Sequence, residues 1–332
     1  MQHKSAMYRI GAAAGLLILI LDNRTALSGM HHGLDICINT LIPSIFPFMV
    51  LSNILTGNVS GTQGLIMEKL GRFCKVPQGS EMLLLTGFLG GYPVGAQNAA
   101  QLYRDGLISR EDAHRMCIFC NNAGPSFLFC ILLPIFSDFE TVLLLWVIQM
   151  FSAILLGHFY PGGAHRSTII RTEHSRTVAD SLSMSIHAMA KVCGWVLVFR
   201  MLLEFLENWF LWLLPSELQV LVTGVLELSN GCLSLAGVQN ESIRFFIASV
   251  LLSFGGICIC MQTFSVCPKE IQKGYCTGKI LHSVLSAVLS LLAMSMKRFL
   301  PVRYVLMILF LAGIILVSSA GNPGIKKKEV AF

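Results

Sequence analysis

Polar residues that could hold a ligand gather at three places in an otherwise apolar sequence. Amide side chains dominate, and amides both donate and accept hydrogen bonds, which suits neutral solutes such as sugars, bases and nucleosides. Helix N-termini beside them would add partial positive charge for an anion. The alternative is that these amides satisfy backbone groups freed where glycine and proline interrupt helices. The candidate binding residues are Gly91, Tyr92, Gln97, Asn98, Asn121, Asn122, Ser126, Glu227, Asn230 and Gln262.

Glu227 is the acidic candidate, because it lies in the apolar segment GVLELSNG. A carboxylate within a membrane is costly, so an acid there is a functional candidate that could couple a solute to a proton or Na⁺. The alternative places Glu227 at a helix end near water. Lys191 and Arg200 also lie in apolar sequence, and their long side chains are able to extend to the membrane interface.

Signatures of enzymes are absent from the sequence. It contains no HExxH zinc motif, no GxSxG nucleophile elbow and no complete phosphate-binding loop. The histidines are dispersed. Cys117 and Cys120 have the spacing of redox or zinc cysteines, but they lie in an apolar run without a second pair. We therefore expect no catalytic residue, no metal site and no cofactor.

The composition identifies the solvent in which this chain is stable. Its 332 residues are 54% hydrophobic and 13% charged, with a mean hydropathy of +0.69. Soluble domains carry about a quarter charged residues, so this chain could not cover a globular surface with ionised groups. The net charge of +6 is scattered between apolar segments and forms no basic patch of the kind that binds nucleic acid. The composition predicts an all-α, polytopic membrane protein whose partner is the lipid bilayer, and a homo-oligomer is compatible with it.

Two elements around the candidate residues cannot be ordinary membrane-spanning helices. In residues 81–104, an apolar arm of about ten residues, half the length that a span needs, meets a glycine-rich turn before a second short arm. This pattern predicts a re-entrant helical hairpin, whose irregular backbone must be buried in protein or line a cavity. In residues 116–136, two asparagines and Pro125 interrupt an apolar run. That segment is predicted to be a broken helix.

The second half of the chain repeats this plan weakly. A glycine pair followed six residues later by a glutamine occurs in both halves, as Gly90-Gly91 with Gln97 and as Gly255-Gly256 with Gln262. We therefore expect a second hairpin at 243–268 and two repeats, each with a hairpin and a broken or interfacial helix. Inverted topology is the expected arrangement, because it lets the hairpin tips meet in the middle of the membrane.

The whole chain divides into two halves with additions at both ends. The N-terminal segment is interpreted as a membrane helix, or alternatively as a signal-like segment, because Ala26-Leu27-Ser28 resembles a cleavage site. The lysines from Lys269 to Lys279 would lie outside in an inverted protein, against the positive-inside tendency, so the orientation stays open. The expected divisions are 1–30 for the first helix, 31–160 for the first repeat, 161–177 for a basic loop, 178–298 for the second repeat, and 299–332 for the last membrane helix and basic tail.

Three segments carry a resemblance to a known family: GFLGGYPVGAQNAAQLYRDGLISREDAHRMCIFCNNAGPSF, GVLELSNG and SFGGICICMQ. They resemble the sporulation integral membrane protein family of the YlbJ type, which belongs to the nucleoside-recognition, or Gate, domain class. The resemblance covers most of the chain from Gly33 to Met296. It implies a multi-pass protein of the cell membrane of endospore-forming bacteria, made in the mother cell, located in mother-cell or forespore membranes, and needed for spore or cortex formation.

The Gate class is named for its similarity to the hairpin core of concentrative nucleoside transporters, in which amides and acids at hairpin tips hold the nucleoside. Here the first tip has Gln97 without an acidic partner nearby, a departure from that pattern. Two functions remain open: a transporter of a small polar solute, or a non-transporting assembly or signalling protein that keeps the fold. A transporter requires Gln97, Asn122, Glu227 and Gln262 to converge on one water-accessible cavity.

Overall fold

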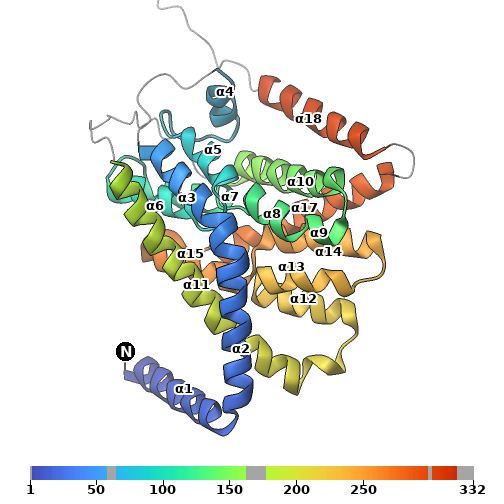
Figure 1. The fold of residues 1–332 in the computed structure, drawn as a ribbon. Helices are drawn as coiled ribbons and strands as arrows, with labels where there is room; N and C mark the ends of the chain where they lie inside the picture. The colour runs from blue at the N-terminus through green and yellow to red at the C-terminus, as the bar shows by residue number, and fades with distance from the viewer. Residues whose placement is uncertain (1, 58–64, 162–176, 298–300, 320–332) are drawn as a thin grey trace, which may run out of the picture.

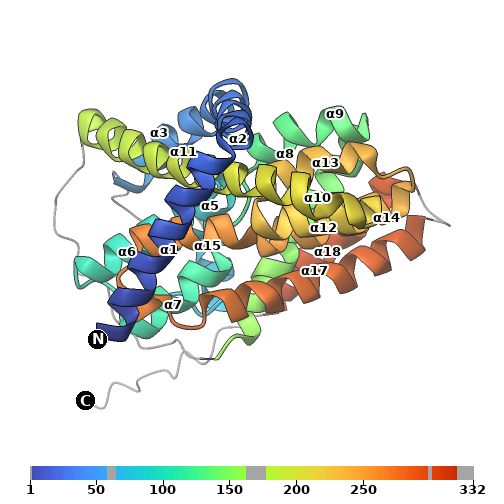
Figure 2. The ribbon, with the colours of Figure 1, turned by 90° about the horizontal axis from the view of Figure 1, so that it is seen from below.

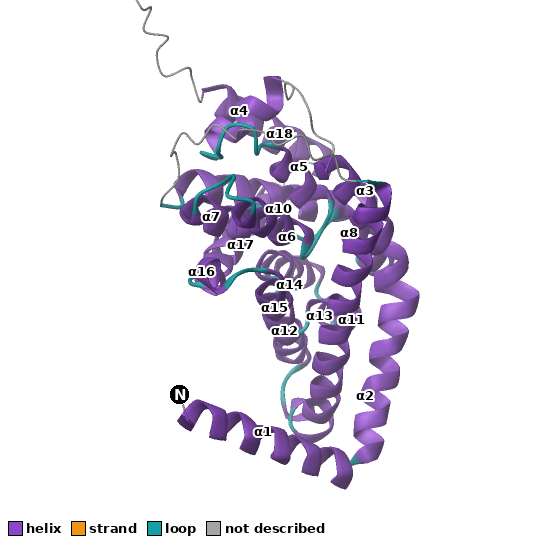
Figure 3. Ribbon diagram, turned by 90° about the vertical axis from the view of Figure 1, so that its left-hand side faces the viewer, coloured by secondary structure: helices purple, strands orange, loops and turns teal. Residues whose placement is uncertain are grey.

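The structure is a computed structural model that describes residues 2–57, 65–161, 177–297 and 301–319. Every regular element in these ranges is helical, as Figure 3 shows. The predicted all-α fold is therefore confirmed for the described part of the chain. The predicted basic loop at 161–177 and the basic tail lie almost entirely outside the described residues.

Among the described residues, five helical runs are long and apolar enough to cross a membrane, which makes the chain an integral, multi-pass membrane protein. Several of these runs contain more than one helix, because short irregularities interrupt them. A shorter apolar helix, α18 (Val302–Ser319), follows the last run. The five runs are Asn23–Ile54, Phe139–Phe159, Val178–Trp209, Glu241–Val266 and Lys269–Lys297.

The N-terminal segment 1–30 contains a boundary between two helices. Helix α1 (Gln2–Leu21) ends before Asp22, whose side chain accepts a hydrogen bond from the Thr25 backbone and caps α2 (Asn23–Ile36). Figures 1 and 3 show α1 turned away from the line of α2. The first candidate span therefore begins at Asn23 rather than within α1.

The first span is α2 continued by a π-helical turn (Cys37–Leu41) and α3 (Ile42–Gly57), and it packs along α11 (Val178–Trp209) (Figure 3). Two glycines one turn apart make this contact close. A Cβ added to Gly29 would lie 2.8 Å from the Cα of Met201, and one added to Gly33 would lie 3.3 Å from the Cβ of Arg200. Small residues at such spacing let membrane helices approach each other closely.

Between the first span and the second, the chain forms a series of short helices. Helices α5 and α6 coincide with the predicted first hairpin at 81–104, and they pack against each other. The predicted broken helix corresponds to α7 and α8, with an irregular break at residues 120–124 between them. The elements are α4 (Leu65–Phe73), α5 (Met82–Leu89), α6 (Val94–Arg104), α7 (Arg110–Phe119), α8 (Pro125–Ile131), α9 (Leu133–Phe136) and α10 (Phe139–Phe159).

The second half, seen from below in Figure 2, has the same order of a span, a pair of short helices, an interrupted run and a further span. Its pair is α12 with α13, and its interrupted run is α14 with α15. The elements are α11 with a 3-10 turn (Leu211–Leu213), α12 (Ser216–Leu226), α13 (Leu228–Ser234) with a second 3-10 turn (Leu235–Gly237), α14 (Glu241–Phe254), α15 (Gly256–Val266), α16 (Lys269–Gln272) and α17 (Tyr275–Lys297).

The hairpin predicted at 243–268 differs from what the structure contains there. Helices α14 and α15 form one candidate span of 26 residues, interrupted only at Gly255 and Gly256, whose φ angles are +85° and +84°. Only glycine adopts this left-handed region readily, so the pair bends the run without folding it back. The glycine pair therefore marks an interrupted span rather than the turn of a hairpin.

Helices α12 and α13 of the second half pack against each other, and Figures 1 and 3 show them side by side. Only Glu227 separates them, in an extended conformation with φ −142° and ψ 118°. A Cβ added to Gly231 would lie 2.1 Å from the Cα of Gly224, so the two helices touch backbone to backbone. The turn at Glu227 therefore requires glycine at position 231.

Candidate functional site

The break between α7 and α8 lies against the tip of the first helix pair. We name residues 90–93 the first tip and residues 120–124 the first break. A Cβ added to Gly87 or to Gly95 would lie 2.0 or 1.9 Å from the carbonyl oxygen of Cys120, so that carbonyl lies between the two arms of the pair. Glycine is needed at both positions because any side chain would displace the break.

The second half has an equivalent contact. The second tip is Glu227 and the second break is Gly255-Gly256. A Cβ added to Gly256 would lie 2.9 Å from the carbonyl oxygen of Gly224 and 3.4 Å from the backbone nitrogen of Leu228. In each half, therefore, the break in the interrupted run is packed against the tip of the preceding helix pair.

Tyr92 connects the two halves. It belongs to the first tip, its ring is buried, and its hydroxyl donates a hydrogen bond of 3.1 Å to the carbonyl of Leu252 in α14. A Cβ added to Gly255 would lie 3.0 Å from the same hydroxyl oxygen. The first tip is therefore held directly against the second break.

Both tips and the first break meet at one cavity of about 30 Å³. Gly91 and Tyr92 come from the first tip, Ser126 from the start of α8, Glu227 from the second tip, and Gln262 from α15. Apolar side chains of the first span and of α11 complete the wall, namely Leu41, Ile45, Val192 and Val196. A cavity with a few convergent polar groups in an apolar wall is the usual form of a small-molecule site.

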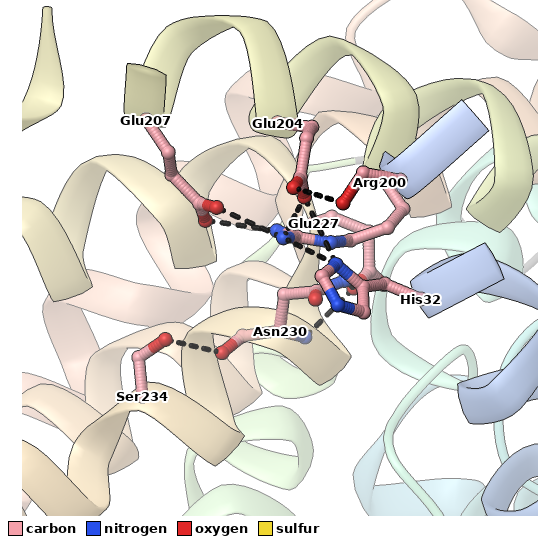
Figure 4. A network of polar contacts seen from close by, with 8 residues as sticks. His32, Arg200, Glu204, Glu207, Glu227, Asn230 and Ser234 are labelled. Atoms are coloured by element: carbon pink, nitrogen blue, oxygen red, sulfur yellow. Dashed lines mark hydrogen bonds and ion pairs between the residues drawn. The ribbon is translucent and has the colours of Figure 1, made fainter. Parts of the chain in front are cut away.

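The Glu227 carboxylate is both buried and fully hydrogen bonded, with 1% of the residue exposed. Its two oxygens accept hydrogen bonds from the backbone nitrogens of Ser229 at 3.1 Å and Asn230 at 2.8 Å, and from the Asn230 amide at 2.6 Å. Figure 4 shows this pairing. Glu227 therefore lies at a helix end, as the alternative interpretation expected, but away from water. It caps α13 and faces the cavity at the same time.

The other predicted residues separate into distinct environments. Five of the ten line the cavity: Gly91, Tyr92, Ser126, Glu227 and Gln262. Asn230 does not line the cavity, and its side-chain amide donates a hydrogen bond to Glu227. Gln97 and Asn98 of α6 do not line it, and Gln97 Oε1 and both polar atoms of the Asn98 side chain have no hydrogen-bond partner among the described residues.

Asn121 and Asn122 of the first break are buried and point toward α15 and α17 rather than into the cavity. The Asn121 amide donates to the hydroxyls of Thr263 at 3.0 Å and Tyr275 at 2.9 Å. The Asn122 amide donates to the carbonyl of Phe119 at 2.7 Å, which satisfies a backbone group freed by the break. Of the four residues that a transporter was expected to bring together, Glu227 and Gln262 meet, whereas Gln97 and Asn122 lie elsewhere.

Two buried residues of α17 were not recognised from the sequence. Lys279 was interpreted as a charge flanking a span, yet neither it nor His282 is exposed at all. Lys279 Nζ donates to the carbonyl of Asn121 at 3.0 Å, and it lies 3.1 Å from His282 Nδ1. The first break is therefore bound to α17 through a buried amine.

A second polar network joins α2 to α11 near one end of both helices. The Arg200 guanidinium binds both oxygens of Glu207 at 2.8 Å and also pairs with Glu204 (Figure 4). Glu204 in turn accepts a hydrogen bond of 2.7 Å from the Ser28 hydroxyl. His32 Nδ1 lies 3.1 Å from Glu204. Arg200 is buried among these partners.

Two carboxyl groups outside the spans have shifted pKa values. The Thr141 hydroxyl donates to Asp138, the N-cap of α10, and lowers the pKa of that carboxyl. Burial raises the pKa of Glu81, which accepts a hydrogen bond of 2.8 Å from the Gly79 backbone before α5. Neither group lies in the cavity. No group of histidines, cysteines and acids that could hold a metal ion exists among the described residues.

Comparison with known proteins identifies one relative. The chain is 24% identical over 313 residues to the sporulation integral membrane protein YlbJ of Bacillus subtilis (strain 168), and the match covers 78% of this chain and 75% of the relative. No protein-family model and no solved structure matches the chain. The helical fold with five candidate spans agrees with the name of the relative. The chain is an integral membrane protein and a distant relative of the YlbJ-type sporulation integral membrane proteins.

Proposed function

We propose that this protein binds a small polar solute between its two halves and moves it across a bacterial membrane during sporulation. The observation that carries the proposal is the convergence of both tips and the first break on one buried cavity that contains Glu227 and Gln262. Interrupted helices within a membrane provide the backbone and small polar groups from which transporters build their sites. The name of the Bacillus subtilis relative supports the link with sporulation.

The two helix pairs are, in this proposal, re-entrant hairpins of two inverted repeats. Helices α5, α6, α12 and α13 contain 8, 11, 11 and 7 residues, whereas a span needs about twenty. The order of elements supports this assignment, because each pair lies between a candidate span and an interrupted run. On this basis the first tip corresponds to Glu227, and the first break corresponds to Gly255-Gly256.

In this proposal, the small cavity corresponds to a closed stage of a transport cycle. About 30 Å³ is the share of one water molecule, whereas sites for drug-sized solutes enclose several hundred Å³. Tyr92, which lines the space, is held in place by its hydrogen bond to Leu252. In this proposal the described conformation is a closed one, and solute entry requires the two tips to separate.

A thermal-shift screen of the purified protein tests solute binding. Nucleosides, sugars and small acids are added to the wild type, to Gln262→Ala and to Gln97→Ala. Gln262 lines the cavity and Gln97 does not, so the second variant is a matched control for loss of a glutamine. At least one compound is expected to raise the melting temperature of the wild type and of Gln97→Ala, but not of Gln262→Ala. A ligand at 100 times its Kd stabilises by about 2.7 kcal/mol, which such a screen detects readily.

A second function is favoured by two observations: the small volume of the cavity and the complete pairing of Glu227. A non-transporting protein that assembles with partners in the sporulating membrane needs no open site. In that case, spore formation survives alanine at Gln97, Asn122, Glu227 and Gln262, whereas disruption of the surface loops abolishes it. A screen in which no compound changes the melting temperature also supports this function over transport.

A further inference from the structure

The strongest feature outside the cavity is the buried pair formed by Lys279 and His282. Both lie in the candidate span Lys269–Lys297, one turn apart on α17, and neither is exposed. Lys279 Nζ has three neighbours that accept hydrogen bonds. They are the carbonyl of Asn121 at 3.0 Å, Oδ1 of Asn122 at 3.5 Å and Nδ1 of His282 at 3.1 Å.

No ion pair compensates the Lys279 charge among the described residues, whose ion pairs all involve other groups. Three titratable groups in the described part of the chain face the pair. The Tyr92 ring lies 5.2 Å from Lys279 Nζ, and Cys260 of α15 is a neighbour of the same amine. Tyr275 of α17 is linked to the pair through its hydrogen bond with Asn121. The neighbours from α10 and from the first break are backbone carbonyls and amides. Burying an ammonium without a counter-charge costs free energy, so Lys279 releases its proton more readily than an exposed lysine does.

The hydrogen bonds of His282 define its tautomer. Nε2 lies 3.1 Å from the carbonyl of Gln149, which can only accept, so Nε2 carries the hydrogen and donates it. Nδ1 is then a lone pair that accepts from Lys279. Neutral His282 therefore acts as the acceptor for a charged Lys279, and the two share one dissociable proton.

The pair is connected both to the first break and to the cavity. The Asn121 carbonyl lies just beyond the C-terminal end of α7, where a positive charge is favourable and an orphaned carbonyl needs a donor. The Tyr92 ring, which contacts Lys279, lines the cavity. The charge on Lys279 therefore acts on the contacts that keep the two halves closed.

We propose that Lys279 and His282 form a proton-exchange site that holds the first break closed against α17 while the proton is bound. On release, an N–H bond of the ammonium breaks, the bonding pair stays on Nζ, and a water molecule takes the proton to become hydronium. The amine that remains binds the Asn121 carbonyl more weakly, so the break separates from α17 more readily. A role of this site in coupling protons to transport rests on the proposed function. Proton exchange and opening of the first break do not require a solute.

An anionic solute is the alternative ligand for a buried lysine, and the geometry argues against it. The ammonium has three N–H groups, and three acceptors already surround it. Lys279 also does not line the cavity. The pair is therefore built to hold a proton rather than an anion.

Hydrogen exchange of the full-length protein, measured by mass spectrometry without any solute, tests the proposal. Exchange of residues 116–128 is followed between pH 6 and pH 9 after correction for the intrinsic rate. For the wild type it is expected to increase with pH, up to about tenfold per pH unit, which is the limit for release of one proton. Lys279→Arg keeps the charge and is expected to stay protected at every pH, and Lys279→Met is expected to exchange rapidly at every pH.

Lys191→Arg is the matched control, because Lys191 is an exposed lysine of another span and donates to the carbonyl of Ser265. It should respond to pH as the wild type does. If Lys279→Met fails to fold, the two arginine variants carry the test. Exchange in the wild type that does not change with pH, or a pH response that persists in Lys279→Arg, overturns the proposal. A negative solute screen contradicts transport and leaves this result unaffected.

Discussion

Tyr92 at the first tip donates a hydrogen bond of 3.1 Å to the carbonyl of Leu252, one turn before the second break. Residues 160 positions apart in the sequence thus join the two halves beside the cavity that Tyr92 lines. The bond satisfies a buried hydroxyl. Since both residues lie at interrupted helices, this contact can be broken without unfolding a span.

Tyr92→Phe tests the strength of this connection. The substitution keeps the ring and removes one hydrogen bond, so we expect a loss of about 1 kcal/mol in the free energy of unfolding. Tyr103→Phe is the control, because that tyrosine is only half-buried and lies on α6 away from the tip. Thermal unfolding of both variants in detergent measures the difference. Equal stability of the two would show that the Tyr92 hydroxyl does not join the halves.

Gly231→Ala tests the turn at the second tip. The new Cβ would lie 2.1 Å from the Cα of Gly224, and backbone at this distance has to move. Overpacking of this kind costs about 1–3 kcal/mol. In Gly237→Ala, by contrast, the new Cβ meets nothing within 4 Å, so that variant should unfold at the wild-type temperature. If Gly231→Ala is as stable as Gly237→Ala, α12 and α13 do not touch at this point.

The network between α2 and α11 makes a separate prediction. Glu204→Ala removes the acceptor that Ser28, His32 and Arg200 share, and it leaves three polar groups with fewer partners. We expect a loss of about 2 kcal/mol, below the full value for a buried pair because these side chains are slightly exposed. Arg110→Ala breaks an ion pair with Glu111 on the surface and should change stability by less than about 0.5 kcal/mol. Similar effects of the two substitutions would contradict a structural role for the network.

Asp138 predicts a dependence of stability on pH. Its folded pKa is lowered by the hydrogen bond from Thr141, so its contribution is complete above the unfolded pKa of about 3.9 and is lost as the pH falls through the folded value. At pH 7, Asp138→Ala should therefore be less stable than the wild type by about 1 kcal/mol, the usual value of an N-cap. This gap should narrow below about pH 4. A gap that stays constant from pH 7 to pH 3 would show that the carboxylate charge is not responsible.

The amino-acid sequence predicted the all-helical membrane fold, because local signals determine it. Length and apolarity indicate the spans, and the glycine-rich turn and the proline after the asparagines indicate α5, α6 and the first break. The second half was harder. Its glycine pair, Gly255-Gly256, led to the prediction of a hairpin at that position. The turn lies instead at Glu227, with Gly224 three residues before it and Gly231 four residues after it.

The buried lysine was missed because it begins an apolar segment, as flanking charges do. A signal was nevertheless present, since the polar positions of α17 follow a helical repeat. Lys279, Ser283, Ser286 and Ser290 recur at intervals of three and four residues, His282 lies on the same helix face, and all five are buried. The distinction between Gln97 and Gln262 was beyond such reasoning, because it depends on how the two halves pack.

Cysteine labelling, read out peptide by peptide with mass spectrometry, tests the central claim that the tips and the first break enclose one solute-accessible cavity. Ser126→Cys and Gln262→Cys lie on opposite halves and both line the cavity, whereas Gln97→Cys does not. We predict that a water-soluble thiol reagent modifies both cavity cysteines slowly, as the halves open, and that one and the same solute protects both without protecting residue 97. Absence of labelling at both positions, or protection of one position without the other, would contradict the account.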